Sequence, residues 1–285
     1  MQKELAYTIA YSSKTHRVRP SLLTRLLTGS LLLGSLSVTT GAQAAIDLKA
    51  NQQPIHAPKN AEAIAQIPAD FTFVTPGKFT VAIASLGSSP PLAFLADDNK
   101  TVIGSEPDIA RLVADSLGLE LNIVPTSWED WPLGVASGKY DAAIINITVT
   151  KARKEKFDFA TYRIDSLGFY VKSTSKIQSI KEAKDIAGLK IIVGSGTNQE
   201  AVLLAWDKQN RANGLPAFQP IYVTDDAAAN LSLQSGRSDA YFGPNVIGAY
   251  KAELTGKHKH VGTVNGAYPN CAHNPCNTRQ GRGLV

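Results

Sequence analysis

Hydrophobic and polar positions recur in a regular order along residues 78–264. The stretch KFTVAIASL (78–86) is rich in residues that favour strands, whereas PDIARLVADSLG (107–118) has apolar residues at helical spacing. Pro107 suits the first turn of this helix and Gly118 suits its C-terminus. Because strands and helices continue to alternate after this point, the pattern predicts βαβ units and a parallel sheet covered by helices.

The same order begins again near residue 189, where LKIIVGSG precedes a long helical pattern over 197–214. The sequence therefore predicts two α/β lobes. The stretches SGKYDAAIIN and SGRSDAYFGPN share a small turn, a basic residue, an aspartate and a short strand, although this similarity is too short to establish a repeat. The expected division is an irregular extension over 45–70, a first lobe over 71–170, a second lobe over 171–263 and a return segment over 264–285.

The N-terminal 44 residues have the features of a secretory signal peptide. Arg17, Arg19 and Arg25 precede an apolar run over 26–38, and an A-x-A cleavage arrangement follows it. Five basic residues and one acidic residue lie in this segment, so its removal lowers the formal net charge from +5 to +1. The basic isoelectric point therefore belongs to the leader and gives no reason to expect a nucleic-acid partner.

The residues after the near-continuous apolar strand YDAAIINIT are polar. Asn146, Thr148 and Thr150 fall at its carboxyl end, and Arg153 begins the next element within a run of lysines. Ligands of open α/β sheets bind beyond the carboxyl ends of strands, and a guanidinium group can hold a carboxylate through two parallel hydrogen bonds. Arg153 is therefore a candidate carboxylate ligand; the alternative is a solvated surface arginine.

A second candidate anion site lies in VGSGTNQE (193–200), where glycines lead into a helix that starts at Thr197 and Asn198. Backbone N–H groups at a helix start favour an anion. The alternative is a capped helix with nothing bound. No Gly-Lys-Ser or Gly-Lys-Thr follows, so this is not a phosphate loop of the nucleotide-binding type.

The two cysteines, Cys271 and Cys276, flank His273. In an exported protein a disulfide or free thiols are favoured over a zinc site, because a second pair of ligands is missing. The sequence predicts no metal and no cofactor.

Four motifs in a fixed order carry a family resemblance over about residues 78–264: GSEPDIARLVADSLGLELNIV, SGKYDAAIINITVTKARKEKFDFA, GLKIIVGSGTNQE and SGRSDAYFGPNVIGAY. The chain resembles the family 3 extracytoplasmic solute-binding proteins, which serve ABC importers of polar amino acids. The resemblance implies an α/β fold of two lobes, the type II or Venus-flytrap arrangement, with a doubly wound sheet in each. It further implies a monomeric, non-enzymatic periplasmic protein that binds a small carboxylate-bearing solute and delivers it to an inner-membrane permease.

The resemblance also assigns ligand-binding positions. Arg153 matches the arginine that binds the α-carboxylate, Asn146 and Thr148 match positions beside it, and Trp128 matches a position against the ligand side chain. In the second lobe Thr197 and Asn198 match the positions at the helix start.

Several positions depart from the family. Leu86 and Pro244 stand where acidic residues meet the ligand's amino group, and Ser89 stands near the place of an aromatic residue that covers the ligand. Since an unpaired buried ammonium group is costly, we expect either replacement acceptors or a ligand without an α-amino group. The replacement candidates are Glu129, Asp130 and Asn245.

The chain also ends before members of this family usually do, so the expected return segment is truncated. Two other functions remain open at this point. A periplasmic dehydratase of the same fold, acting on a prephenate-like substrate, would need a general acid such as Glu106 or Glu200. A ligand-sensing module would have the same fold.

Overall fold

The computed structural model describes residues 52–84, 89–223, 226–264 and 281–284. The predicted signal peptide over 1–44, the residue Leu86 and the cysteine pair at 271 and 276 lie outside the described residues. Within the described ranges no helix has both the length and the apolar character needed to cross a membrane.

The sheet of the first lobe has three parallel strands in the order β4-β1-β5. Strand β1 (Lys78–Ala84) lies in the middle, between β4 (Glu120–Thr126) and β5 (Ala142–Ile144). Helix α2 (Ser105–Leu117) packs its alanines against this sheet, as its apolar spacing predicts. It ends where expected, because Gly118 takes the left-handed conformation (φ 71°) that stops a helix.

The long apolar strand predicted before Arg153 is broken in two, which corrects the sequence-based expectation. Strand β5 ends at Ile144 and β6 covers only Ile147–Thr148. Between them Asn146 has a φ of 48°, a left-handed conformation that asparagine adopts more readily than most residues. The turn redirects the chain at the carboxyl end of the sheet.

The sheet of the second lobe has five strands in the order β10-β9-β11-β8-β12. Strands β9, β10 and β11 run parallel, whereas β8 pairs antiparallel with both β11 and β12. Strand β8 pairs along its whole length with β12 and over residues 167–170 with β11, so the sheet of this lobe begins at Leu167, four residues before the expected boundary at 171. The bounds are β8 Leu167–Lys172, β9 Lys190–Val193, β10 Gln219–Tyr222, β11 Ala240–Pro244 and β12 His258–Val264.

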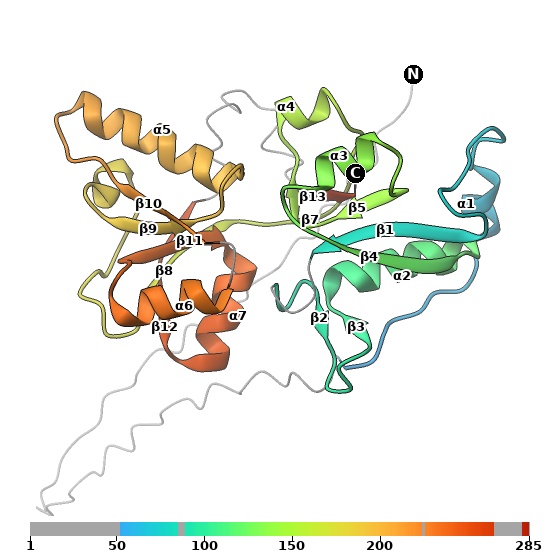
Figure 1. Ribbon diagram of the computed structural model, residues 1–285, viewed down its shortest axis with the longest axis horizontal. Helices are drawn as coiled ribbons and strands as arrows, with labels where there is room; N and C mark the ends of the chain where they lie inside the picture. The colour runs from blue at the N-terminus through green and yellow to red at the C-terminus, as the bar shows by residue number, and fades with distance from the viewer. Residues whose placement is uncertain (1–51, 85–88, 224–225, 265–280, 285) are drawn as a thin grey trace, which may run out of the picture. The chain divides into compact units, whose positions relative to one another are not determined.

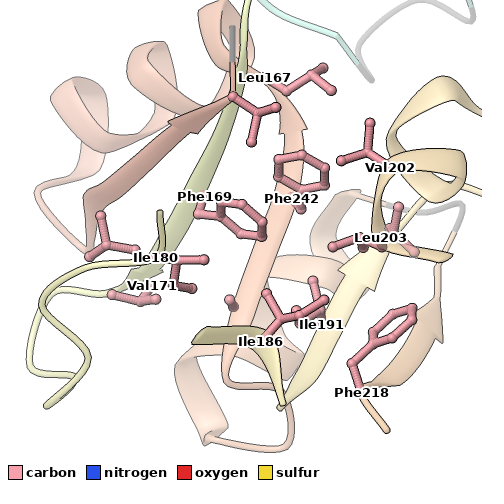
Figure 2. Close-up of a cluster of buried hydrophobic side chains, with 14 residues drawn as sticks. Leu167, Phe169, Val171, Ile180, Ile186, Ile191, Val202, Leu203, Phe218 and Phe242 are labelled. Atoms are coloured by element: carbon pink, nitrogen blue, oxygen red, sulfur yellow. The ribbon is translucent and has the colours of Figure 1, made fainter. Parts of the chain in front are cut away.

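Helices cover both faces of this sheet (Figure 1). The Phe169 ring stacks on Phe242 at 4.0 Å between centroids, and both pack with Val202 and Leu203 of α5 (Asn198–Ala212) (Figure 2). The next residue, Tyr170, points to the opposite face and contacts α7 (Asn245–Thr255). Helix α6 (Asp226–Ser235) contacts β8 and β11 of the same sheet.

The two similar stretches noted in the sequence make equivalent contacts. Asp141, just before β5, accepts a hydrogen bond from the Thr80 backbone N–H at 2.6 Å and donates its own N–H to the Thr80 carbonyl at 2.8 Å. Asp239, just before β11, makes the same two bonds with Lys190, each 2.8 Å long. Each aspartate therefore ties its strand to the neighbouring parallel strand.

The remaining elements are short. Helix α1 (Ala61–Ala65) forms within the segment 45–70, the expected irregular extension. Of the expected return segment, the structure describes Val264 and strand β13, which pairs antiparallel with β6 and β7. The other bounds are β2 Phe94–Leu95, β3 Val102–Ile103, α3 Trp131–Ala136, α4 Lys151–Lys154, β7 Ala160–Ile164, the 3-10 helix η2 Ala183–Ile186 and β13 Gly281–Leu284.

Candidate functional site

A cavity of about 420 Å³ is lined by residues from both lobes. Its wall comes from the carboxyl ends of parallel strands, where ligands of α/β sheets bind. In the first lobe these residues are Ala84 at the end of β1, Trp128 after β4 and Asn146 after β5; in the second lobe they are Gly194 after β9, Val223 after β10 and Pro244 at the end of β11.

Four of the seven predicted ligand-binding residues line this cavity: Ser89, Trp128, Asn146 and Thr197. Arg153 lines an adjoining cavity instead, together with Trp131, Phe157 and Gly196. The two cavities share Trp128, Glu129 and Ser195 in their walls, and the guanidinium of Arg153 lies against the Trp128 ring.

Local contacts hold the Arg153 side chain in this position. Thr150 caps α4 by accepting a hydrogen bond from the Arg153 backbone N–H at 3.2 Å. The guanidinium donates from Nη1 to the Thr148 carbonyl oxygen at 2.9 Å. Its Cζ atom lies 5.1 Å from the Trp128 ring centroid and 5.8 Å from that of Trp131, within the range of cation–π attraction.

The two remaining predicted residues, Thr148 and Asn198, form a hydrogen bond with each other. The Thr148 hydroxyl donates to Asn198 Oδ1 at 2.8 Å, and both side chains are buried. Thr148 belongs to the first lobe and Asn198 begins α5 in the second, so the bond joins the lobes. The Asn198 Nδ2 atom is buried and has no hydrogen-bond partner among the described residues.

The predicted anion site at the start of α5 holds a carboxylate of the chain itself. The Gly196 backbone N–H donates to Glu200 Oε2 at 2.7 Å, and Tyr222 donates to the other oxygen at 2.6 Å. Thr197 is the N-cap and accepts from the Glu200 backbone N–H. An incoming anion would therefore compete with Glu200 for this N–H group.

Acidic residues outnumber basic ones in the lining of the cavity that both lobes form. Among the described residues its lining includes Glu106, Glu129 and Asp226, against the single cation Lys251. Glu106 is fully buried and accepts a hydrogen bond from the Tyr162 hydroxyl at 3.3 Å. The sequence named Glu106 only as a general acid for the dehydratase alternative, because nothing local in the sequence indicates that α2 begins at the cavity.

The three candidate replacements for the missing acids differ in position. Glu129 lines the cavity. Asp130 and Asn245 are absent from its described lining; the Asn245 side-chain oxygen accepts a hydrogen bond from the Tyr170 hydroxyl at 2.7 Å. Pro244, at the position where the family has an acid, does line the cavity.

Two functional groups beside the cavity were not singled out from the sequence. Arg163 of β7 donates from Nη2 to the Asn146 side-chain oxygen and lies 3.7 Å from Asp165. Tyr241 lines the cavity, and its burial together with the nearby Asp226 carboxylate raises its pKa, so the phenol keeps its proton. The alternation of apolar and polar residues in ATYRI indicates a strand that carries Arg163, but this local pattern does not show that the strand lies beside the cavity.

Known proteins resemble this chain over the same region. Residues 81–267 match the family described as bacterial extracellular solute-binding proteins, family 3. The L-cystine-binding protein TcyJ of Escherichia coli (strain K12) is 33% identical over 162 residues, which are 56% of this chain and 57% of that protein. The glutamate/glutamine/aspartate/asparagine-binding protein BztA of Rhodobacter capsulatus is 30% identical over 163 residues, which are 54% of this chain and 46% of that protein.

The matched region spans roughly half of each of these two relatives. Among solved structures, an ancestral arginine-binding protein bound to arginine superposes with a TM-score of 0.59 at 23% identity, covering 73% of this chain and 83% of that one. This likeness confirms the predicted two-lobed α/β fold. Since the family match covers well over half of the chain, the chain belongs to the bacterial extracellular solute-binding proteins of family 3.

Proposed function

We propose that this protein is the periplasmic solute-binding component of an ABC importer, and that it takes an amino acid or a similar small carboxylate. Its partners are then the solute and an inner-membrane permease. The relatives named above are binding proteins for amino acids, which supports this class of ligand. We propose no bond-breaking chemistry.

The observation that carries the proposal is the cavity at the carboxyl ends of the strands of both lobes. A solute that contacts both walls binds more tightly when the lobes are closed around it. Such a ligand shifts an open–closed equilibrium toward the closed state by its difference in affinity for the two states.

The proposed carboxylate site is built from Arg153, Thr148 and Asn198. Arg153 and Thr148 are already joined through the Thr148 carbonyl, and Asn198 accepts from the Thr148 hydroxyl. A carboxylate that entered here would accept hydrogen bonds from the guanidinium and from the buried Asn198 amide. Trp128, which lines both cavities and contacts the guanidinium, would then lie beside the bound carboxylate.

An α-amino group can be accommodated although Leu86 and Pro244 are not acidic. Glu129 lines the cavity as well as the adjoining one that holds Arg153, and its carboxylate suits an ammonium group. Of the two explanations for the missing acids, replacement by other residues is therefore the one we adopt. An amino acid is then a better ligand than the matching carboxylate without an amino group.

The dehydratase alternative needs a general acid that reaches the substrate. Glu200 accepts hydrogen bonds from Gly196 and Tyr222; Glu106 lines the cavity, but it is fully buried and accepts a hydrogen bond from Tyr162. A direct assay for product formation from prephenate separates this alternative from transport. We expect no product.

The decisive experiment is isothermal titration of the full chain with matched ligands. The panel pairs amino acids, L-cystine and L-arginine among them, with carboxylates that lack the amino group and with amines that lack the carboxylate. We expect binding only where both groups are present, and a rise in the unfolding midpoint with the same ligands. Binding of amines alone would contradict the arginine assignment, and binding of no amino acid would contradict the proposed function.

A further inference from the structure

An ion pair lies in the wall of the cavity at its second-lobe end. The Lys251 ammonium of α7 contacts the Asp226 carboxylate at the start of α6, and both residues line the cavity. The two side chains are 22% and 41% exposed, respectively. The Lys251 ammonium also lies 5.9 Å from the ring centroid of Tyr241, another residue of the wall.

Both members of this pair retain hydrogen-bonding capacity toward the cavity. A lysine ammonium has three donors, and an ionised carboxylate has about four acceptor positions. The described contacts use one donor of Lys251 and one oxygen of Asp226. The pair therefore offers an acidic and a basic group side by side.

We propose that Asp226 and Lys251 form a second charged subsite. It binds the far end of a ligand that carries one ammonium and one carboxylate group at each of its two ends. The ligand class is a diamino dicarboxylic acid. This inference rests on the proposed function, because the near end of the same ligand would occupy the Arg153 side of the site.

The charges favour this arrangement. A carboxylate placed against Lys251 and an ammonium placed against Asp226 produce an alternating cluster of four charges, in which every neighbour is opposite in sign. Partial burial reduces solvent screening, so each contact is stronger than at an open surface. A ligand with an uncharged far end would offer no charged group to Asp226 or to Lys251.

The size and lining of the cavity fit a ligand with two polar ends. A volume of about 420 Å³ lies within the range of sites that bind ligands larger than a simple amino acid. Apolar residues of the second lobe, among them Val223, Ala229 and Ile247, line the wall beside the ion pair. They suit a linker of methylene groups or sulfur atoms between the ends.

The competing explanation is that the ion pair only fastens α6 to α7. A purely structural pair would change stability when broken but would not distinguish between ligands. The experiment must therefore measure how each variant changes the preference among ligands, and not affinity for one ligand alone.

Four ligands separate the contributions of the two far-end groups. L,L-2,6-diaminopimelate has both, L-lysine lacks the far carboxylate, L-2-aminopimelate lacks the far ammonium, and L-norleucine lacks both. Titration calorimetry on the full chain gives a Kd for each ligand. The wild-type protein should bind diaminopimelate at least about tenfold more tightly than norleucine, the value expected for one charge-assisted hydrogen bond.

Two variants assign the far-end groups to residues. Lys251→Met should lower the ratio of affinities for diaminopimelate and lysine by about tenfold. Asp226→Asn should lower the ratio of affinities for diaminopimelate and aminopimelate by about tenfold. The control is Lys78→Met, which breaks the 2.7 Å ion pair with Glu120 away from the cavity and should leave both ratios unchanged.

Several outcomes overturn the inference. The wild-type protein could bind all four ligands equally, or Lys251→Met could weaken all four by the same factor. If neither variant folds, the ratios of the wild-type Kd values for the four ligands still decide whether the subsite exists. Binding of other amino acids without any preference for diaminopimelate would reject the subsite and leave the proposed function standing, whereas binding of no amino acid would reject both.

Discussion

Replacing Arg153 with lysine separates the two roles that its position allows. The side chain could hold the ligand carboxylate, or it could only fix the local structure through the Thr148 carbonyl and the Trp128 ring. Lysine keeps the positive charge near both of these groups but lacks the planar fork that binds a carboxylate through two parallel bonds.

The structure gives different magnitudes for the two roles. A lysine ammonium can still donate to the Thr148 carbonyl, so the loss in unfolding free energy is mainly a weaker cation–π contact, about 0.5–1 kcal/mol. Loss of one charge-assisted bond to a carboxylate costs about 1.5–3 kcal/mol of binding, which raises Kd roughly 10- to 150-fold. We therefore expect a large effect on affinity and a small one on stability.

Titration calorimetry measures the affinity for an amino acid that binds the wild-type protein, and urea unfolding measures the stability. Both experiments use the full chain. The matched control is Lys154→Gln, since Lys154 is exposed and absent from the described lining of both cavities. A Kd for Arg153→Lys within about twofold of wild type, with unfolding free energy lowered, would refute carboxylate binding and leave Arg153 a structural role.

Two further changes test the scaffold, each by urea unfolding. Asp141→Ala removes two hydrogen bonds from backbone N–H groups, one of them on the buried Thr80, and should lower the unfolding free energy by about 2–4 kcal/mol. Asp239→Ala removes one such bond and should lower the unfolding free energy by about 1–2 kcal/mol. Equal losses in the two variants would contradict the expectation that the loss follows the number of bonds removed. Burial raises the pKa of Asp115, but a backbone N–H group and His56 together hold it below the ordinary value of 3.8. A lowered folded pKa means that its stabilisation is present above the unfolded pKa and is lost as the pH falls through the folded pKa. Asp115→Asn should therefore destabilise at neutral pH, and its difference from wild type should vanish well below pH 3.8; a difference that persists in acid would contradict the assignment.

Local chemistry explains which parts of the fold could be predicted from the sequence. Helix α2 was recognisable because its apolar residues repeat at helical spacing and Gly118 stops it. The break at Asn146 was not, because the apolar run continues through Ile145 and Ile147 while the turn depends on tertiary contacts, including the bond from Arg163. Periodicity reports burial, and both sides of this break are buried.

The same distinction applies to the site. Thr148, Thr150 and Arg153 lie within six consecutive residues, so a strand end and a helix cap were enough to bring them together. Asp226 and Lys251 are separated by a helix and a strand, and each is unremarkable in its own element. Their pairing follows from the way in which α6 and α7 lie on the sheet, which no local pattern encodes.

This difference in origin suggests how the two lobes divide the work of recognition. The proposed carboxylate site is held largely by bonds within one short segment of the first lobe, to which Asn198 at the start of α5 adds one hydrogen bond. The charges at the far end come from α6 and α7, and a substitution at either helix alters them without affecting Arg153. A solute-binding protein built in this way can keep its requirement for a carboxylate while its preference for the rest of the ligand changes. The first lobe would then set the chemical class of the ligand, and the wall at α6 and α7 would select among members of that class.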